Sequence, residues 1–458
     1  MTELPTIAME KVDFLPPNRV TDDASVLTLK NLVLEPMLSW QDGKVAQGLF
    51  DRFALSEDGR HWQLELRQDA RFHDDTPVQA QHAKAFIEEI LKARDMFGMP
   101  WSYARYLDGA EITAEGPRLS IRTPEPFPDL PDILSEFYLP RPDAKGEPTL
   151  GTGPWAVESF TRGAEAVLSH RADGRRLRFV AIPRAEDRLA ALQDGTVQAA
   201  MHMERLARPR RALDGFIWHE QAITLSVIAY MNGASGVFAD PRARLAANLA
   251  IDRQALITQV MGGLGLPATT IVSPWHHGFG PAGLPAMGHD PTRARALLTQ
   301  VEAPKTITLR SPSHMPERAP EIAAFLADSL RDVGFAVTID LAHDRPAYAR
   351  ELGEKRTGDL AIFDSSPHST FRVADDKISS RTRAVWWQGV VDPKADGLFE
   401  TARRILDPQA RDKAYGALLR HLHAEPHWLY LFHPVEALAH VPELRGLSLT
   451  HKGILRIA

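Results

Sequence analysis

The chain contains 458 residues, of which 44% are hydrophobic and 24% are charged. This length and composition are typical of a soluble globular protein with two or three domains. The formal charge of −6 argues against a nucleic-acid partner, which would require a basic surface. Cysteine is absent, which excludes disulfides, thiolate metal sites and cysteine nucleophiles and is compatible with either the periplasm or the cytosol.

The N-terminal residues 1–20 include acids and prolines but no apolar stretch of the kind found in signal peptides. No apolar run approaches the roughly 18–20 residues that cross a bilayer. Either a signal peptide has been removed from the chain or the protein stays in the cytoplasm. Directly after this segment, Asp23 is expected to cap a helix.

The segment from Leu55 to Ala80 (LSEDGRHWQLELRQDARFHDDTPVQA) predicts strands joined by turns. Residues 56–59 form a tight turn, because Gly59 can adopt a positive φ at little cost. Alternation of apolar and polar residues over 62–66 indicates a half-buried strand, and a second, shorter strand is expected within 71–77. A helix is expected to follow over residues 80–93.

A proline-rich passage over residues 124–148 leads to the sequence GTGPW at residues 151–155. Two glycines and a proline within five residues fit a chain crossing between domains, where backbone geometry matters more than side chains.

Helix–glycine–strand units recur in the rest of the chain, which is typical of α/β layers. The predicted helix and strand pairs are residues 185–193 and 197–201, residues 320–333 and 335–339, and residues 346–355 and 359–363. Two further helices are expected over 242–250 and 253–261, with Asp240 and Asp252 as their N-caps. Asp240 is followed by proline, a preferred way to begin a helix, and the same Asp-Pro pair recurs at Asp290 and Asp407.

Three of these segments resemble the extracytoplasmic solute-binding proteins of family 5, which serve peptide, nickel and opine ABC importers. The 55–80 segment is similar to the family pattern DG-x-x-W-x-F-x-L-R…F-H-D-G-x-P, except that Asp75 stands where the family usually has glycine. GTGPW is close to the family's GTGPY. Residues 247–268 (ANLAIDRQALITQVMGGLGLPA) resemble its A-x-x-x-A-I-D-R-x-x-I…G-x-G-x-P-A phrase.

The resemblance implies an α/β fold of the two-lobed periplasmic-binding-protein type (class II, cluster C), with an inserted third subdomain and a hinged ligand cleft. Lobe I would comprise residues 1–28, 150–221 and 432–458. The inserted subdomain would hold residues 29–149, with Trp62 and Phe72 in its core, and lobe II would hold residues 222–431. Two crossing strands would form the hinge that lets the lobes close on a ligand.

The resemblance also implies a non-enzymatic protein without a cofactor. It would capture a small polar ligand, namely a peptide, an opine-like conjugate or an oligosaccharide, and deliver it to the transmembrane subunits of an ABC permease. A periplasmic monomer is expected, in peripheral contact with the membrane complex and without a nucleic-acid partner. The alternatives are an intracellular ligand-sensing domain with the same fold and a nickel- or metallophore-binding relative. No GxSxG, P-loop or HExxH motif is present in the sequence.

The main candidate ligand site is the nine-residue segment 364–372, which follows the predicted strand 359–363. In α/β folds, ligand crevices commonly lie beyond the carboxyl ends of strands. The predicted site residues in this segment are Asp364, Ser365, Ser366, His368 and Arg372. The family's W-x-x-D-x-x-D-P loop is not preserved here, which disfavours a generic peptide. The alternative is a turn whose serine and threonine side chains bond to their own backbone.

Further ligand-binding candidates are Trp101, Tyr103, Trp275, His276, Trp386 and Trp387. Adjacent tryptophans point to opposite faces of an extended chain, so at most one of Trp386 and Trp387 is expected to line a ligand site. His421, His423 and His427 are interpreted as chance spacing on the surface, and only the last two could share a helical face. No residue is therefore assigned as a metal ligand.

Overall fold

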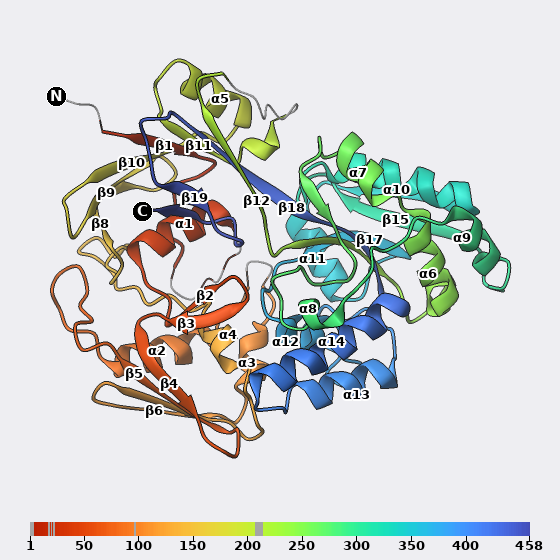
Figure 1. Cartoon of the computed structure of the whole chain (residues 1–458), viewed down its shortest axis with the longest axis horizontal. Helices are drawn as coiled ribbons and strands as arrows, with labels where there is room; N and C mark the ends of the chain where they lie inside the picture. The colour runs from red at the N-terminus through yellow and green to blue at the C-terminus, as the bar shows by residue number, and fades with distance from the viewer. Residues whose placement is uncertain (1–3, 17–18, 20, 22, 96–97, 207–213) are drawn as a thin grey trace. The chain divides into compact units, whose positions relative to one another are not determined.

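The computed structural model describes the chain except for residues 1–3, 17–18, 20, 22, 96–97 and 207–213 (Figure 1). Two compact units are present: residues 1–95, 103–223 and 435–458 form the first, and residues 96–102 and 224–434 form the second. Each unit combines sheet and helix. Among the described residues, no helix is both long enough and apolar enough to cross a membrane.

The first unit contains a mixed sheet in which β1 is parallel to both of its neighbours, β10 and β11. Its strands are β1 (Thr6–Met9), β8 (Trp155–Thr161), β9 (Glu165–His170), β10 (Arg176–Ala181), β11 (Ala199–Met201), β12 (Ile217–Ala222) and the last part of β18 (Trp428–His440). The helices α1 (Ala24–Val33) and α5 (Ala185–Gln193) belong to this unit, and Asp23 caps α1 as predicted.

A second, antiparallel sheet in the first unit consists of β4 (Phe50–Leu55), β5 (His61–Leu66), β7 (Arg118–Arg122) and β6 (Glu111–Glu115), and α2 (Ala80–Ile90) packs on it. Shorter elements of the same unit are β2 (Leu38–Gln41), β3 (Lys44–Gln47), α4 (Leu130–Leu134), the 3-10 turn η1 (Met203–Arg205), β19 (Leu447–Leu449) and β20 (Leu455–Ile457). The five-residue helix α3 (Ser102–Tyr106) begins at the boundary with the second unit.

The predicted hairpin is partly wrong. Its first strand corresponds to β5, but that strand pairs with the preceding β4 across the turn at Gly59, and residues 71–77 form only one isolated bridge, Arg71 to Pro77. Asp75 has φ 63°, so it adopts the left-handed conformation for which a glycine is usual, and Asp is one of the few other residues that tolerate it. The turn is therefore retained despite the substitution.

The GTGPW sequence lies against the end of α1 within the first unit. The Gly153 amide donates to the Val33 carbonyl at 2.9 Å. A Cβ atom at Gly151 would lie 2.0 Å from that same carbonyl oxygen, and one at Gly153 would lie 2.5 Å from the carbonyl oxygen of Leu32. Close backbone approach therefore explains why glycine stands at both positions.

The second unit is built on a sheet of order β16-β15-β17-β13-β18, to which β14 adds on β18. Its strands are β13 (Ser226–Met231), β14 (Gly265–Pro267), β15 (Thr306–Pro312), β16 (Ala336–Ala342), β17 (Leu360–Ser365) and the first part of β18. Its helices and turns are η2 (Val237–Ala239), α6 (Pro241–Ala250), α7 (Arg253–Gln259), α8 (Phe279–Ala282), α9 (Pro291–Leu298), α10 (Ala319–Val333), α11 (Arg345–Gly353), α12 (Thr370–Val373), η3 (Ala374–Ile378), α13 (Pro393–Ala402) and α14 (Pro408–Ala424).

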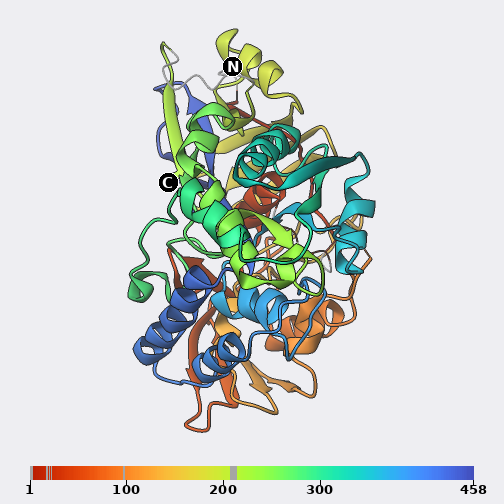
Figure 2. The ribbon, with the colours of Figure 1, turned by 90° about the vertical axis from the view of Figure 1, so that its right-hand side faces the viewer.

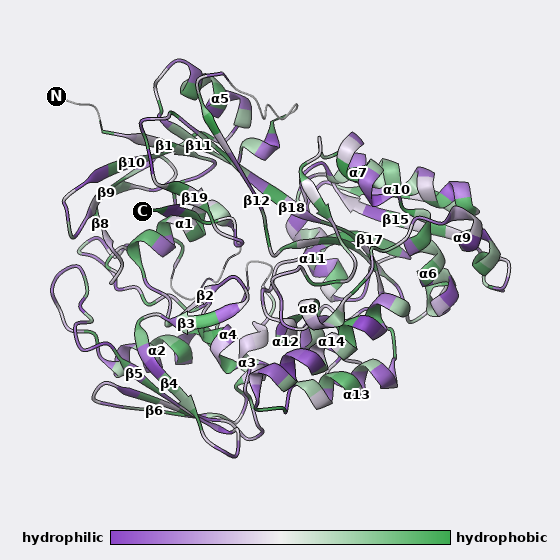
Figure 3. Cartoon of the chain, viewed as in Figure 1, coloured by the Kyte–Doolittle hydropathy of each residue, from purple (hydrophilic) through white to green (hydrophobic). Residues whose placement is uncertain are grey.

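Helices α13 and α14 lie next to each other in this unit (Figures 1 and 2). Both carry hydrophilic as well as hydrophobic residues (Figure 3), as expected of helices with one buried and one exposed side. The predicted Asp caps are confirmed: the side chains of Asp240, Asp290 and Asp407, each followed by proline, and of Asp252 each accept from a backbone amide of the helix that follows.

Strand β18 takes part in both units. Its first residues pair with β13, where Tyr230 faces Trp428, and with β14. Its last residues pair with β11, where Ala200 faces Ala439, and with β12. The strand therefore has a neighbour on each side in both units.

Candidate functional site

The strand before the predicted segment 364–372 ends two residues later than expected. Asp364 and Ser365 are the last residues of β17, where they pair in register with Val227 and Ser226 of β13. Ser366 and His368 belong to the connection that follows, and His368 is buried. The Ser365 hydroxyl is also buried and has no hydrogen-bond partner among the described residues, which makes it a polar group available at the strand end.

The carboxylate of Asp364 lies next to a buried arginine. Arg345, the first residue of α11, places Nη2 3.7 Å from Asp364 Oδ2. The guanidinium stacks over the ring of Phe363 at 4.3 Å from its centroid. An aromatic face favours a cation electrostatically, so the stack holds Arg345 at the end of the strand.

Beyond Ser369, whose hydroxyl caps α12, the chain continues into the π-helical turn η3. This turn buries Lys377, whose ammonium donates to the Tyr230 hydroxyl at 3.2 Å. The ammonium lies 5.5–5.7 Å from the ring centroids of Tyr230, Trp386 and Trp428. Burial, and then the charge of Asp364, raises the pKa of Tyr230 well above its usual value, so its hydroxyl stays protonated.

Three further buried charges lie on α12 and η3: Arg372, Asp375 and Asp376. The Thr382 hydroxyl donates to Asp375 Oδ1 at 3.0 Å. Together with Arg345, Asp364 and Lys377 they make a set of three cations and three carboxylates, which we call the charged cluster. Five of the six side chains are buried and Asp364 is partly exposed. Buried charges are costly to assemble, and they commonly mark functional sites.

Trp386 joins the charged cluster, whereas Trp387 does not. The Trp386 ring lies 5.1 Å from that of Phe363 and faces Lys377. Trp387 instead donates through Nε1 to the Val390 carbonyl at 2.8 Å and is covered by Arg383. Of the two tryptophans, Trp386 is the one that contacts the charged cluster.

The loop that contains Trp275 and His276 supports the strand-end segment from one side. His276 is buried, with Nε2 2.8 Å from the Pro367 carbonyl and Nδ1 2.8 Å from the Ser273 hydroxyl. Burial lowers the pKa of His276 to about 4, so it is neutral at physiological pH. Thr370 donates to the His277 carbonyl at 2.6 Å. His276 therefore positions the segment 364–372, because its ring bonds Ser273 within its own loop and the Pro367 carbonyl within the segment.

The remaining two candidates lie in different units. Trp101 belongs to residues 96–102 of the second unit, and Tyr103 belongs to the first. Tyr103 is fully buried, donates to the Glu136 carboxylate and packs edge-on against Phe137. The structure therefore gives Tyr103 a core role.

Sequence reasoning missed several members of this region, namely Tyr230, Arg345, Asp375, Asp376, Lys377 and Trp428. Asp375 and Asp376 were visible only as adjacent acids, and the register of β13 with β18 brings Trp428 to Tyr230. The signal that could have found Lys377 is its position within an otherwise apolar and acidic stretch immediately after the predicted segment.

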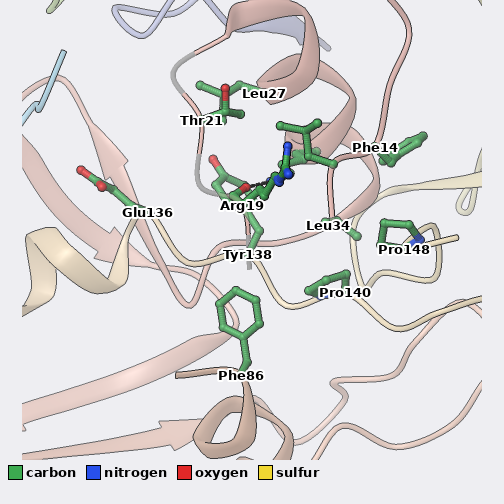
Figure 4. Close-up of a pocket in the computed structure, with 12 residues that line it drawn as sticks. Phe14, Arg19, Thr21, Leu27, Leu34, Phe86, Glu136, Tyr138, Pro140 and Pro148 are labelled. Atoms are coloured by element: carbon green, nitrogen blue, oxygen red, sulfur yellow. Dashed lines mark hydrogen bonds between the residues drawn. The ribbon is translucent and has the colours of Figure 1, made fainter. Parts of the chain in front are cut away.

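A pocket in the first unit is a second candidate for the ligand site, but it is too small to hold a ligand (Figure 4). Its lining includes Phe14, Tyr138 and Lys30, which donates to the Arg19 carbonyl at 3.2 Å. Burial lowers the pKa of Lys30 to about 8. The cavity volume of about 20 Å³ is room for a water molecule and far below the roughly 300 Å³ of small-molecule sites.

A second buried polar cluster lies in the first unit. His202 places Nδ1 2.9 Å from Glu436 Oε2 and Nε2 2.9 Å from the Ser25 hydroxyl, and Glu204 accepts from the Ala437 amide at 2.9 Å. Burial, and then the charge of Glu436, raises the pKa of Glu204 to about 7. Burial lowers the pKa of His202 to about 4. Glu204 therefore keeps its proton up to about neutral pH.

We expect Glu204→Gln to stabilise the first unit progressively as the pH rises from about 4.5 to about 7. Over this range the folded chain keeps the Glu204 proton that the unfolded chain releases, so the wild-type contribution to stability falls with rising pH. Glutamine retains the acceptor for Ala437 and cannot ionise. Because one pKa unit corresponds to about 1.4 kcal/mol, the gain should reach about 2–3 kcal/mol above pH 7.

Urea unfolding at pH 5 and pH 8 measures this difference. Burial lowers the pKa of His202 and the charge of Glu204 opposes this shift, so the comparison reports the two groups together. Glu158→Gln, on an exposed position of β8, is the control and should shift stability equally at both pH values. An identical effect of Glu204→Gln at the two pH values would contradict the prediction.

The comparisons with known proteins agree on one family. The family described as "Bacterial extracellular solute-binding proteins, family 5 Middle" matches residues 44–371. The nickel-binding periplasmic protein of Escherichia coli K12 is 23% identical and aligns with 91% of this chain and 87% of its own. The glutathione-binding protein GsiB of Escherichia coli O1:K1 is 25% identical, with 88% and 83% covered.

Among solved structures, NikA from Brucella suis in complex with Fe(III)-EDTA superimposes with a TM-score of 0.79 at 20% identity. The superposition covers 99% of this chain and 100% of that protein. A likeness at this level of identity establishes the fold. It confirms the predicted α/β fold of the periplasmic-binding-protein type.

Proposed function

The chain belongs to family 5 of the bacterial extracellular solute-binding proteins, and on this premise we propose that it captures a small zwitterionic solute for an ABC importer. Proteins of this family bind solutes for transport and are not enzymes. The solute class we propose is a short peptide or an opine-like conjugate, each of which carries an ammonium group and at least one carboxylate.

The charged cluster carries this proposal. It offers the guanidinium of Arg345 and the ammonium of Lys377 to a carboxylate, and it offers Asp364 to an ammonium. A zwitterion can replace ion pairs within the protein without leaving an unpaired buried charge, whereas a neutral sugar that displaced the same pairs would offer no charge in return. Trp386 adds an apolar surface beside these charges.

Two substitutions test separately how the protein binds the carboxylate end and the ammonium end of such a ligand. Lys377→Met keeps the side-chain length and should lower the affinity for the carboxylate end at least tenfold, which is about 1.4 kcal/mol. Asp364→Ala should lower the affinity for ammonium-bearing ligands by a similar factor. Calorimetry with the best compound from a thermal-shift screen of di- and tripeptides, opines, oligosaccharides and nickel chelates measures both effects.

Lys394→Met, at an exposed position of α13, is the matched control and should bind normally. If both Lys377→Met and Asp364→Ala bind the selected compound as tightly as the wild type, the charged cluster is not the ligand site. Selection of neutral oligosaccharides by the screen would contradict the zwitterionic class, and selection of nickel chelates would favour the nickel-binding relatives instead.

We further propose that the protein works outside the cytoplasm as a monomer that docks on a permease. The name of the Escherichia coli relative, a periplasmic protein, supports this location. Fractionation of cells that produce the native gene product tests it, because an intracellular sensor with the same fold would remain in the cytoplasmic fraction.

A further inference from the structure

The interpretation of His421, His423 and His427 as surface histidines is wrong for two of the three. His421 and His427 are buried, with relative exposures of 6% and 1%. Helix α14 ends at Ala424, and the chain turns at Pro426 into β18, so His427 returns toward His421. His423 points elsewhere, with Nδ1 2.8 Å from the Thr269 carbonyl.

Both buried imidazoles converge on one carboxylate oxygen. Nε2 of His421 lies 2.7 Å from Asp392 Oδ2, and Nε2 of His427 lies 2.9 Å from the same atom. The other oxygen of Asp392 accepts from the amides of Lys394 and Ala395 at the start of α13. The helix cap thus fixes the orientation of the carboxylate and presents Oδ2 to the two rings.

From this convergence we propose that Asp392, His421 and His427 form a binding site for a divalent transition-metal ion such as Zn²⁺. Two imidazole nitrogens and one carboxylate oxygen are a donor set that zinc accepts, with a fourth position left for water or another ligand. Binding requires each Nε2 to lose its proton, and the neutral ring then carries its proton on Nδ1.

Glu425 is placed to support such a site. Its Oε1 lies 4.0 Å from Nδ1 of His421, on the ring nitrogen opposite the one that faces Asp392. Donor atoms of Asp392, His421 and Glu425 all lie within 4.8 Å of one another. The 4.0 Å separation exceeds a hydrogen bond, so the exposed Glu425 side chain must move closer to accept the second N–H of a metal-bound His421, which is the usual role of an outer carboxylate.

Charge and access also suit a metal ion. The four side chains contribute two carboxylates and two neutral imidazoles, and a divalent cation balances them. The nearby buried guanidinium of Arg244 donates to the carbonyls of Phe238, Ala239 and Pro426 and makes no ion pair with Asp392 within the described part of the chain. The Glu425 side chain is 55% exposed, so solvent reaches this edge of the site.

Calorimetric titration of the chelator-treated protein with ZnCl₂ tests the proposal. We expect one Zn²⁺ per chain, and we expect His421→Gln and His427→Gln each to weaken binding at least about tenfold. His423→Gln is the matched control on the same helix and should bind as the wild type does. Glu425→Gln alters an exposed side chain, leaves the fold intact and should weaken binding by a smaller factor.

Substitution with Co²⁺ provides a spectroscopic readout that does not depend on thermal stability. Four-coordinate Co²⁺ in the wild type should give intense visible bands, and these should be lost in His427→Gln. Lys377→Met should retain both Zn²⁺ affinity and the bands, which distinguishes this site from the charged cluster. Absence of saturable Zn²⁺ binding in the wild type, or equal losses in His423→Gln and His421→Gln, would overturn the proposal.

Discussion

Replacing Gly151 by alanine is expected to lower the free energy of unfolding of the first unit by about 3 kcal/mol, because the new methyl group has no room. The added Cβ would lie 2.0 Å from the Val33 carbonyl oxygen and 2.6 Å from Cδ2 of Leu34. Val33 is the last residue of α1, and its carbonyl already accepts from the Gly153 amide. Relief of the clash therefore requires the helix end and the GTGPW sequence to separate.

Urea unfolding followed by circular dichroism measures this loss. Gly397→Ala is the control, since a Cβ atom there would meet nothing within 4 Å and the residue lies inside helix α13. Alanine has the higher helix propensity, so this control should stabilise the protein by roughly 0.5–1 kcal/mol. A neutral Gly151→Ala variant would show that α1 can move away from this sequence at no cost.

Replacing Arg253 by methionine is expected to destabilise the second unit by about 3–5 kcal/mol. The guanidinium is buried and donates to the carbonyls of Tyr430 at 2.8 Å, Asn248 at 3.0 Å and Ile251 at 3.2 Å. It also donates to the Asn248 side chain, which bonds in turn to the Trp428 carbonyl. Methionine fills the space but leaves these acceptors buried without donors.

Thermal and urea unfolding monitored by tryptophan fluorescence measure the Arg253→Met effect. Arg242→Ala provides the comparison, because Arg242 lies on the neighbouring helix α6 and its ion pair with Asp240 is exposed. An exposed pair contributes about 0–1 kcal/mol. Equal losses in the two variants would mean that the buried network around Arg253 contributes no more than a surface contact.

Arg253 and Gly151 both belong to sequence patterns of the family. These patterns can be recognised in the sequence, but the contacts that require the two residues are seen only in the structure. Arg253 is the arginine of the AIDR phrase, and Gly151 begins GTGPW. The sequence predicted only the local structure at Arg253, since Asp252 caps the helix that begins there, as expected. The distant partners of these residues, Tyr430 for Arg253 and Val33 for Gly151, lie far along the chain, where no periodicity indicates them.

The candidate site was predictable only in part for the same reason. Asp364 and Trp386 were found because each stands near a recognisable strand end or aromatic pair. Lys377 was missed because its environment comes from Tyr230 and Trp428, which strand register brings together. The approach of His427 to His421 depends on the reversal at Pro426, which helical spacing alone predicted incorrectly.

Strand β18 has a consequence for the order in which the chain can fold during synthesis. Residues 428–440 are an inner strand of the main sheet in both units, so neither sheet is complete until these residues have been translated. Contacts that join distant parts of a sequence also form slowly. Both units should therefore remain incompletely folded on the ribosome until residues 428–440 emerge, which keeps the nascent chain accessible to chaperones up to that point.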